Sequence, residues 1–284
     1  MLHTLQGHSN KINDVELSPD GQTIASASRD KTVRLWNIRG NLLHTLQGSD
    51  FSIVGNAIGI RDIEFSPDGQ IIASAGWNKS IKLWNLEGKL LYTLKSHRRD
   101  VEDVEFSPDG QTIASASEDN TIKLWNTKGN LLHTFKGHNS GIRDVEFSPD
   151  GQTIASASQD NTIKLWNTKG NLLYTLKSHG DEAIDVEFSP DGQTIASASQ
   201  DNTIKLWNTK GNLLYTLRGH SSWVNSIEFS PNGKNIASSS YDDTVKLWSL
   251  DLDEVMSRGC NWVRDYLENN PNVSEEDRKI CDGI

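Results

Sequence analysis

A repeat of about 41 residues runs through most of this chain and limits its possible folds more than any other feature. The dipeptide Leu-Trp occurs six times, and its tryptophans follow one another at intervals of 48, 41, 41, 41 and 41 residues. A Ser-Pro-Asp-Gly segment, Ser-Pro-Asn-Gly in the last copy, keeps the same period. Such a period is typical of architectures in which each repeat is one supersecondary unit. The tryptophans are Trp36, Trp84, Trp125, Trp166, Trp207 and Trp248.

One unit, residues 138–178, predicts four short strands joined by tight turns. In the segment Ser148-Pro149-Asp150-Gly151, proline presets φ, aspartate can bond the backbone and glycine accepts a positive φ. The second strand is rich in small residues, so a bulky group should pack closely on it. The unit therefore predicts a four-stranded antiparallel meander. The expected strands cover residues 142–147, 153–158, 162–166 and 172–176.

Three motifs that recur together resemble those of the WD-repeat family. Five tryptophans follow a Gly-His or Ser-His pair whose histidine lies 28 residues earlier, and five are followed by Asn where the family has Asp. The resemblance covers residues 1–250 and implies an all-β fold, a β-propeller of six four-stranded antiparallel blades. Residues 251–284 differ in character, and residues 252–267 have the spacing of an amphipathic helix. This short C-terminal helical tail resembles the C-terminal extensions of large bacterial WD-repeat proteins.

The first residues of the chain bear on how the ring closes. Residues 2–8 match the fourth-strand segment at residues 132–138, whereas nothing after Trp248 supplies a fourth strand. We therefore expect residues 2–6 to complete the last blade, closing the ring and removing both open sheet edges. The family more often has seven blades. Domain-swapped or oligomeric closure, and a chain cut from a longer protein, are alternatives.

The resemblance also implies a buried hydrogen-bond network of His, Ser, Asp and Trp in each blade. A buried indole N–H needs an acceptor, serine can accept and donate onward, and imidazole can link serine to a carboxylate. Five similar sets in five blades indicate a structural part, because a catalytic serine is single and exposed. Histidines in different blades lie too far apart to share a metal ion. The sets are His8, Ser26, Asp30 and Trp36; His97, Ser115, Asp119 and Trp125; His138, Ser156, Asp160 and Trp166; His179, Ser197, Asp201 and Trp207; and His220, Ser238, Asp242 and Trp248.

Blade 2 departs from this pattern. Asn56 replaces the histidine and Asn78 replaces the aspartate, and seven extra residues, Ser49 to Gly55, precede its first strand. We expect a weaker network and a local protrusion there.

A few loop positions differ between the otherwise similar units, and they point to a partner-binding patch. They lie just before the network aspartate or at the start of the first strand, so they share one face of the disc. A closed ring makes blades 6, 1 and 2 neighbours, and Trp, Tyr and Arg dominate interface energetics. The alternative is harmless drift between repeats. The residues of the hypothesis are Arg29, Arg61, Trp77, Trp223 and Tyr241.

The first strands also carry a ring of acids that should line the central channel. An acidic collar could hold a cation or a basic peptide. Alternatively, the acids pair with strand lysines such as Lys123 and Lys164, or they are solvated. The ring comprises Glu16, Glu64, Glu105, Glu146, Glu187 and Glu228, with Asp14, Asp62, Asp103, Asp144 and Asp185 two residues earlier.

Composition narrows the function further. With 28 Lys and Arg against 38 Asp and Glu, the net charge of −10 disfavours binding to nucleic acid or an anionic membrane. Two cysteines, Cys260 and Cys281, do not make a disulfide framework, so we expect a cytoplasmic protein. These two cysteines could pair, but in a reducing cytoplasm we expect them to be free thiols. We expect no cofactor or metal.

The leading hypothesis is a non-enzymatic, monomeric scaffold that binds a protein or peptide through its loop face. The alternative is a purely structural spacer or oligomerisation module. Catalysis is disfavoured because the sequence has no phosphate-cradling glycine motif and no zinc spacing.

Overall fold

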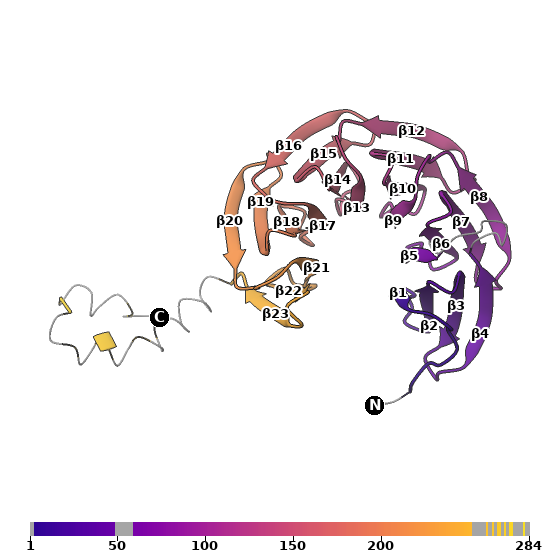
Figure 1. Ribbon diagram of the computed structural model, residues 1–284, viewed down its shortest axis with the longest axis horizontal. Helices are drawn as coiled ribbons and strands as arrows, with labels where there is room; N and C mark the ends of the chain where they lie inside the picture. Colours follow the sequence, from indigo (N-terminus) through magenta and orange to yellow (C-terminus); the bar gives the residue numbers. More distant parts are fainter. Residues whose placement is uncertain are drawn as a thin grey trace.

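In the computed structural model, the described residues form six antiparallel sheets that stand side by side around a central channel (Figure 1). We number these sheets as blades 1 to 6 in chain order. Five of them have four strands and the sixth has three, so the all-β fold and its repeating unit agree with the sequence. The structure describes residues 3–48 and 59–251, and also Cys260, Val263, Tyr266, Leu267, Asn270, Val273, Ser274 and Cys281.

Each blade is a meander in which every strand pairs with the next one along the chain. Blade 1 consists of β1 (Ile12–Leu17), β2 (Thr23–Ser28), β3 (Thr32–Asn37) and β4 (Leu42–Gln47), and blade 2 of β5 (Ile60–Phe65), β6 (Ile71–Gly76), β7 (Ser80–Asn85) and β8 (Leu90–Lys95). Blade 3 consists of β9 (Val101–Phe106), β10 (Thr112–Ser117), β11 (Thr121–Asn126) and β12 (Leu131–Lys136), and blade 4 of β13 (Ile142–Phe147), β14 (Thr153–Ser158), β15 (Thr162–Asn167) and β16 (Leu172–Lys177). Blade 5 consists of β17 (Ala183–Phe188), β18 (Thr194–Ser199), β19 (Thr203–Asn208) and β20 (Leu213–Arg218), and blade 6 of β21 (Val224–Phe229), β22 (Asn235–Ser240) and β23 (Val245–Ser249).

Side chains in the turns hold each meander in register. In blade 4, the Ser148 hydroxyl donates to Asp150 at 2.6 Å and accepts from the Thr153 amide at 2.9 Å. Gly151 follows with φ of +68°, a left-handed conformation that glycine adopts without strain. The same turn recurs in the other blades because the Ser-Pro-Asp-Gly segment recurs, with Asn232 accepting the serine bond in place of aspartate in blade 6. The local sequence is therefore sufficient to define the turn.

The hydrophobic core lies between the blades. Residues of β10, β11 and β12 in blade 3 pack against β13, β14 and the Trp166 ring of blade 4. We call the surface a blade turns to the next one its back face, and the surface it turns to the previous one its front face. Ala114 and Ala116 on the back face of blade 3 belong to the same buried cluster as Trp166, so small residues face a bulky one as expected.

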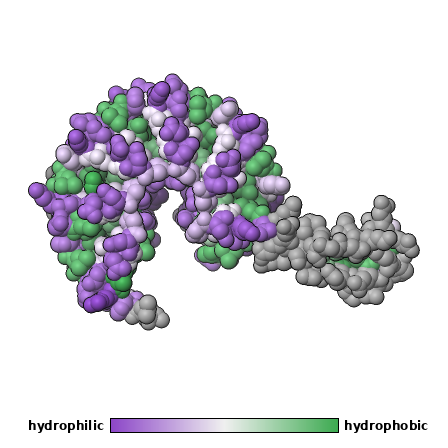
Figure 2. Space-filling view, turned by 180° about the vertical axis from the view of Figure 1, so that it is seen from behind, coloured by the Kyte–Doolittle hydropathy of each residue, from purple (hydrophilic) through white to green (hydrophobic). Residues whose placement is uncertain are grey.

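The ring is open. The described residues 3–7 form no strand, β23 has no fourth strand beside it, and blades 1 and 6 are separated in Figure 1. Figure 2 shows the same opening from behind as a deep notch. The expected closure by residues 2–6 therefore does not form among the described residues. Each of the two end blades therefore exposes an apolar face, whereas the equivalent faces of the inner blades are covered by a neighbouring blade.

The tail is described at only a few positions. Cys260, Val263, Tyr266 and Leu267 are helical, while most of the helix expected over residues 252–267 lies outside the described residues. A disulfide joins Cys260 to Cys281, with the two Cα atoms 5.5 Å apart. The expectation of a reduced pair is thus wrong in this structure. The extra segment of blade 2, Ser49 to Gly55, and Asn56 also lie outside the described residues.

Candidate interaction surface

The His, Ser, Asp and Trp side chains of one blade form a continuous chain of hydrogen bonds. In blade 4 the Trp166 indole N–H donates to the Ser156 hydroxyl at 2.9 Å, and this hydroxyl lies 2.8 Å from Nε2 of His138. Nδ1 of His138 lies 2.9 Å from Oδ2 of Asp160. An ionised carboxylate only accepts, so Nδ1 carries the proton and Nε2 accepts from serine. Each buried polar side chain of this His-Ser-Asp-Trp network therefore has a hydrogen-bond partner.

Four segments of each blade bring these groups together. Serine stands on the second strand, tryptophan on the third, and aspartate in the turn between them, while histidine lies just before the first strand. The structure brings together all five sets, with imidazole-to-carboxylate distances of 2.8–3.0 Å. The corresponding indole-to-hydroxyl distances are 2.8–3.0 Å.

Electrostatics favour this neutral-imidazole arrangement. Burial lowers the pKa of His97 and of His138 and outweighs the opposing effect of their aspartates. Burial alone would raise the pKa of Asp30, but hydrogen bonds from Thr32, Ser9 and His8 lower it to about 2. The serine that links the indole to the imidazole is enclosed, since Ser156 is 0% exposed. Such a hydroxyl has no room for a substrate, so the geometry is that of a strut within the blade.

Blade 2 keeps only part of the network. The Trp84 indole still donates to Ser74 at 2.9 Å. Asn78 stands in place of the aspartate, and its amide donates to the Gly48 carbonyl at 3.1 Å. An amide can therefore anchor this turn by bonding to the chain of blade 1.

The aspartates of the central channel connect neighbouring blades. Oδ2 of Asp103 in blade 3 accepts a hydrogen bond from the Val145 amide in blade 4 at 2.9 Å. The same bond crosses all five junctions, at 2.6–3.1 Å, from Asp14, Asp62, Asp103, Asp144 and Asp185. Sequence analysis found these residues but missed this role. The only signal in the sequence is the recurrence of an aspartate at this position in five of the six repeats. Its partner is a backbone amide of the next blade, which no residue type reveals.

The environment of the channel glutamates disfavours their ionised form. Burial, and then the nearby charge of Glu228, raise the pKa of Glu187 to about 8, and burial raises that of Glu16 to about 7. The two lysines suggested as partners bond elsewhere within the described residues: Lys123 donates to Thr134 and Lys164 to Thr175, on the outer side of each blade. Among the described residues, no group of three or more His, Cys, Asp or Glu is arranged to hold a metal ion.

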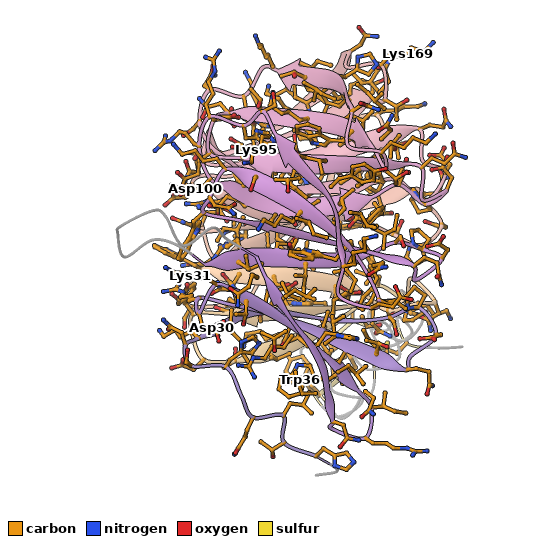
Figure 3. The ribbon with its side chains drawn as sticks, turned by 90° about the vertical axis from the view of Figure 1, so that its right-hand side faces the viewer. Asp30, Lys31, Trp36, Lys95, Asp100 and Lys169 are labelled. Carbon is orange, nitrogen blue, oxygen red and sulfur yellow. A yellow bond between two sulfur atoms is a disulfide. The ribbon has the colours of Figure 1, made fainter. Side chains whose placement is uncertain are left out.

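One face of the disc carries the variable loop residues. Figure 3 shows Asp30, Lys31 and Asp100 on one side of the disc and Lys169 on the other, so the start of the first strand and the second turn share a face. We call it the loop face. On it, the Arg29 guanidinium lies 5.2 Å from the centre of the Trp77 ring, and its Nε donates to Asn13 at 3.2 Å.

Two further groups occupy the loop face. Arg61 pairs with Glu102 at 3.2 Å, and Arg143 from blade 4 pairs with the same carboxylate at 3.3 Å. In blade 6 the Trp223 and Tyr241 rings meet edge to face, 5.6 Å apart. These rings remain 45% and 65% exposed. Edge-to-face geometry stabilises the pair while leaving apolar surface for a ligand.

The five residues of the patch hypothesis do not form one continuous surface. Arg29, Arg61 and Trp77 lie on blades 1 and 2, while Trp223 and Tyr241 lie on blade 6, across the opening (Figure 1). The reason is physical: their proximity depended on a closed ring, and the ring is open. The loop face thus holds two separate clusters.

None of the described residues builds a helix long and apolar enough to cross a bilayer.

A radial array of six antiparallel meanders, five of which contain an internal His-Ser-Asp-Trp hydrogen-bond network, defines a propeller-type repeat protein. The family model described as "WD domain, G-beta repeat" matches residues 1–37, 40–85, 88–126, 129–167, 170–208 and 211–249. The chain belongs to this family.

Similarity to individual curated proteins is confined to short segments. An uncharacterized WD repeat-containing protein of Synechocystis sp. is 49% identical over 47 residues, which are 16% of this chain and 14% of that protein. The Notchless protein homolog of Arabidopsis thaliana is 53% identical over 45 residues, 16% of this chain and 10% of that protein. Ribosome assembly protein 4 of Chaetomium thermophilum is 57% identical over 35 residues, 12% of this chain and 7% of that protein. The matched segments thus cover a small fraction of each relative.

Proposed function

We propose that this protein is a non-enzymatic module that binds a protein or peptide through the loop face of blade 6. Membership of the WD-repeat family supports a role in protein–protein interaction. One relative is named for ribosome assembly, which is compatible with such a role. The proposal includes a monomeric, cytoplasmic protein that does not bind nucleic acid or membranes, in keeping with its net charge of −10.

The exposed pair Trp223 and Tyr241 carries this proposal. At the same two positions blade 5 has Glu182 and Gln200, and blade 4 has Gly141 and Gln159. The aromatic pair is therefore not required by the blade itself. An exposed aromatic pair loses little conformational entropy on binding and offers a large apolar contact area.

The two clusters suggest different contributions to binding. Arg61 is already paired with the buried Glu102, and the Arg29 guanidinium stacks on Trp77. Their charges are partly satisfied within the protein, so we assign them a secondary role. The exposed aromatic surface of blade 6 is the better anchor for an apolar segment of the partner.

Affinity capture followed by titration tests the proposal. The wild-type chain is used to isolate a partner, and the affinity of that partner is then measured for Trp223→Ala, Tyr241→Ala and the double variant. The matched control is Glu182→Ala with Gln200→Ala, at the same positions of blade 5. We expect the aromatic variants to weaken binding at least about tenfold, the size of an interface hot spot, and the control to bind normally. Equal affinity of all variants would reject the aromatic pair as the binding site.

A further inference from the structure

A pocket of about 460 Å³ lies beside the outer two strands of blade 3 and gathers basic side chains. The alternation of side chains along these strands explains how they meet. Ile122 of β11 belongs to the buried cluster shared with blade 4, so its neighbours Thr121 and Lys123 turn to the opposite, front face. Their cross-strand partners on β12, Lys136 and Thr134, stand on the same face and line the same pocket.

Lys123 is the buried cation of this pocket. It is 7% exposed, and its ammonium donates to the Thr134 hydroxyl at 3.2 Å, which is the one acceptor it has among the described residues. An ammonium has three N–H donors, so further donors remain for a ligand. Burial lowers the pKa of Lys123; Asp119 opposes this effect, while Lys136 and Arg98 add to it. A bound anion would offset both the burial and the like charges.

Two exposed cations complete the lining. Arg98 comes from the segment between β8 and β9, and Lys136 is the last residue of β12. Neither side chain forms an ion pair within residues 3–48 and 59–251. A guanidinium can bind two phosphate oxygens at once, and an ammonium supplies a compact charge. The pocket thus combines one fixed cation with two cations that are free to turn toward a ligand.

One carboxylate, that of Asp119, also lines the pocket, but its oxygens are already occupied. Oδ1 accepts from the amide and the hydroxyl of Thr121, while Oδ2 lies 3.0 Å from Nδ1 of His97 and accepts from the Arg98 amide at 2.8 Å. Burial lowers the pKa of His138, so its imidazole adds no charge. Three cations against one carboxylate leave a net formal charge of +2, which a phosphate dianion would balance.

The equivalent lysines of two other blades have different surroundings. In blade 4, Lys164 and Lys177 line a pocket of about 510 Å³, but Asn139 stands where blade 3 has Arg98. In blade 2, the Lys82 ammonium donates at 2.9 Å to a backbone carbonyl at the end of β4 in blade 1. The third cation therefore distinguishes the pocket of blade 3 from that of blade 4.

We propose that the pocket of blade 3 binds a phosphate dianion, either as the free ion or as the monoester of a small molecule. Lys123, Arg98 and Lys136 donate to the phosphate oxygens. The remaining volume accommodates the organic part of an ester, since pockets of a few hundred Å³ are the usual size for small ligands. A single carboxylate would balance only half of the local charge. The site is separate from Trp223 and Tyr241 and does not depend on the function proposed for them.

Calorimetric titration of the full chain tests this site with two probes, inorganic phosphate and glycerol 3-phosphate. The titrations are run at constant ionic strength and at about pH 7.5, where both probes are largely dianions. We expect saturable 1:1 binding that weakens at least about tenfold in the double variant Arg98→Ala with Lys136→Ala. Both residues are exposed, so the variant should keep the thermal midpoint of the unliganded wild type. The matched control, Asn139→Ala with Lys177→Ala in blade 4, should bind as tightly as the wild type.

The same titrations define the outcomes that overturn the proposal. The absence of saturable binding for both probes would mean that the pocket does not hold a phosphate dianion. Equal weakening in the blade 4 control would indicate general attraction to basic surface, and unchanged affinity of the blade 3 variant would assign the binding elsewhere. Where the blade 3 variant alone weakens binding, the tighter of the two probes identifies the ligand as the free ion or as the ester.

Discussion

Blade 4 and blade 6 have almost the same third strand, but they differ completely in what that strand contacts. Thr162–Asn167 lies between two blades, and its Ile163 and Leu165 are buried. Val245–Ser249 lies at the end of the ring, and its Val245 and Leu247 are largely exposed. A blade of this protein therefore has a strand pattern of its own but no core of its own. Burial is a property of the junction, as expected for repeats that contact only their neighbours.

The largest effect should come from truncating the same leucine in the middle and at the end of the ring. Leu165→Ala removes a fully packed side chain, and we expect it to lower the free energy of unfolding by about 3 kcal/mol. Leu247→Ala removes an exposed one and should change it by less than about 0.5 kcal/mol. Urea denaturation followed by tryptophan fluorescence measures both. Equal losses would mean that a neighbour covers blade 6 in solution.

A smaller difference should separate a complete network from a partial one. Ser156→Ala in blade 4 leaves both the Trp166 indole and the His138 imidazole without their shared partner, and should cost about 2–3 kcal/mol. Ser74→Ala in blade 2 deprives only the Trp84 indole of its side-chain acceptor and should cost about 1 kcal/mol. Both free energies of unfolding come from the same denaturation experiment. A larger loss in blade 2 would contradict the cooperative role of the histidine.

The channel acids should make stability depend on pH. Burial raises the pKa of Glu16 to about 7 and of Glu187 to about 8. Between the ordinary glutamate pKa and these raised values, the folded protein therefore keeps protons that the unfolded chain has already released. This contribution is fully present below about pH 4.5 and is lost as the pH rises through 7 to 8. Between pH 6 and pH 8 the two groups together should lose about 2 kcal/mol after allowance for solvent screening, so we expect the thermal midpoint to fall by about 4–8 °C.

Two glutamine substitutions in the channel compare the middle of the ring with its end. Burial raises the pKa of both Glu146 and Glu228, but that of Glu146 well above its usual range because it is more deeply buried and, second, because more carboxylates surround it. Calorimetry at pH 8 should therefore show a larger stabilisation from Glu146→Gln than from Glu228→Gln. The reverse order would place the more costly charge at the end of the ring.

Prediction from sequence succeeded where the determining contacts are local or recur at the repeat period. The Ser148 to Gly151 turn, the strands of residues 138–178 and the partners of Trp166 all depend on residues within one unit. It did not anticipate that the five patch residues lie in two clusters, because Trp223 and Arg29 were placed together by an assumed closure; their role in binding stays a prediction. The expectation that Cys260 and Cys281 are reduced was wrong, because it rested on an assumed compartment and because the sequence does not show that the two thiols lie in contact.

By itself, the amino-acid sequence determined the repeating blade: its strand order, its turns and its internal strut of histidine, serine, aspartate and tryptophan. The tertiary structure alone decided that the ring stays open, which acids bridge neighbouring blades and which apolar faces meet water. The physical reason is that a 41-residue period defines each unit and its contact with the next, and these terms are the same at every junction. Closure depends instead on the accumulated rotation of all six blades and on the two end faces, and neither quantity is encoded in any single repeat.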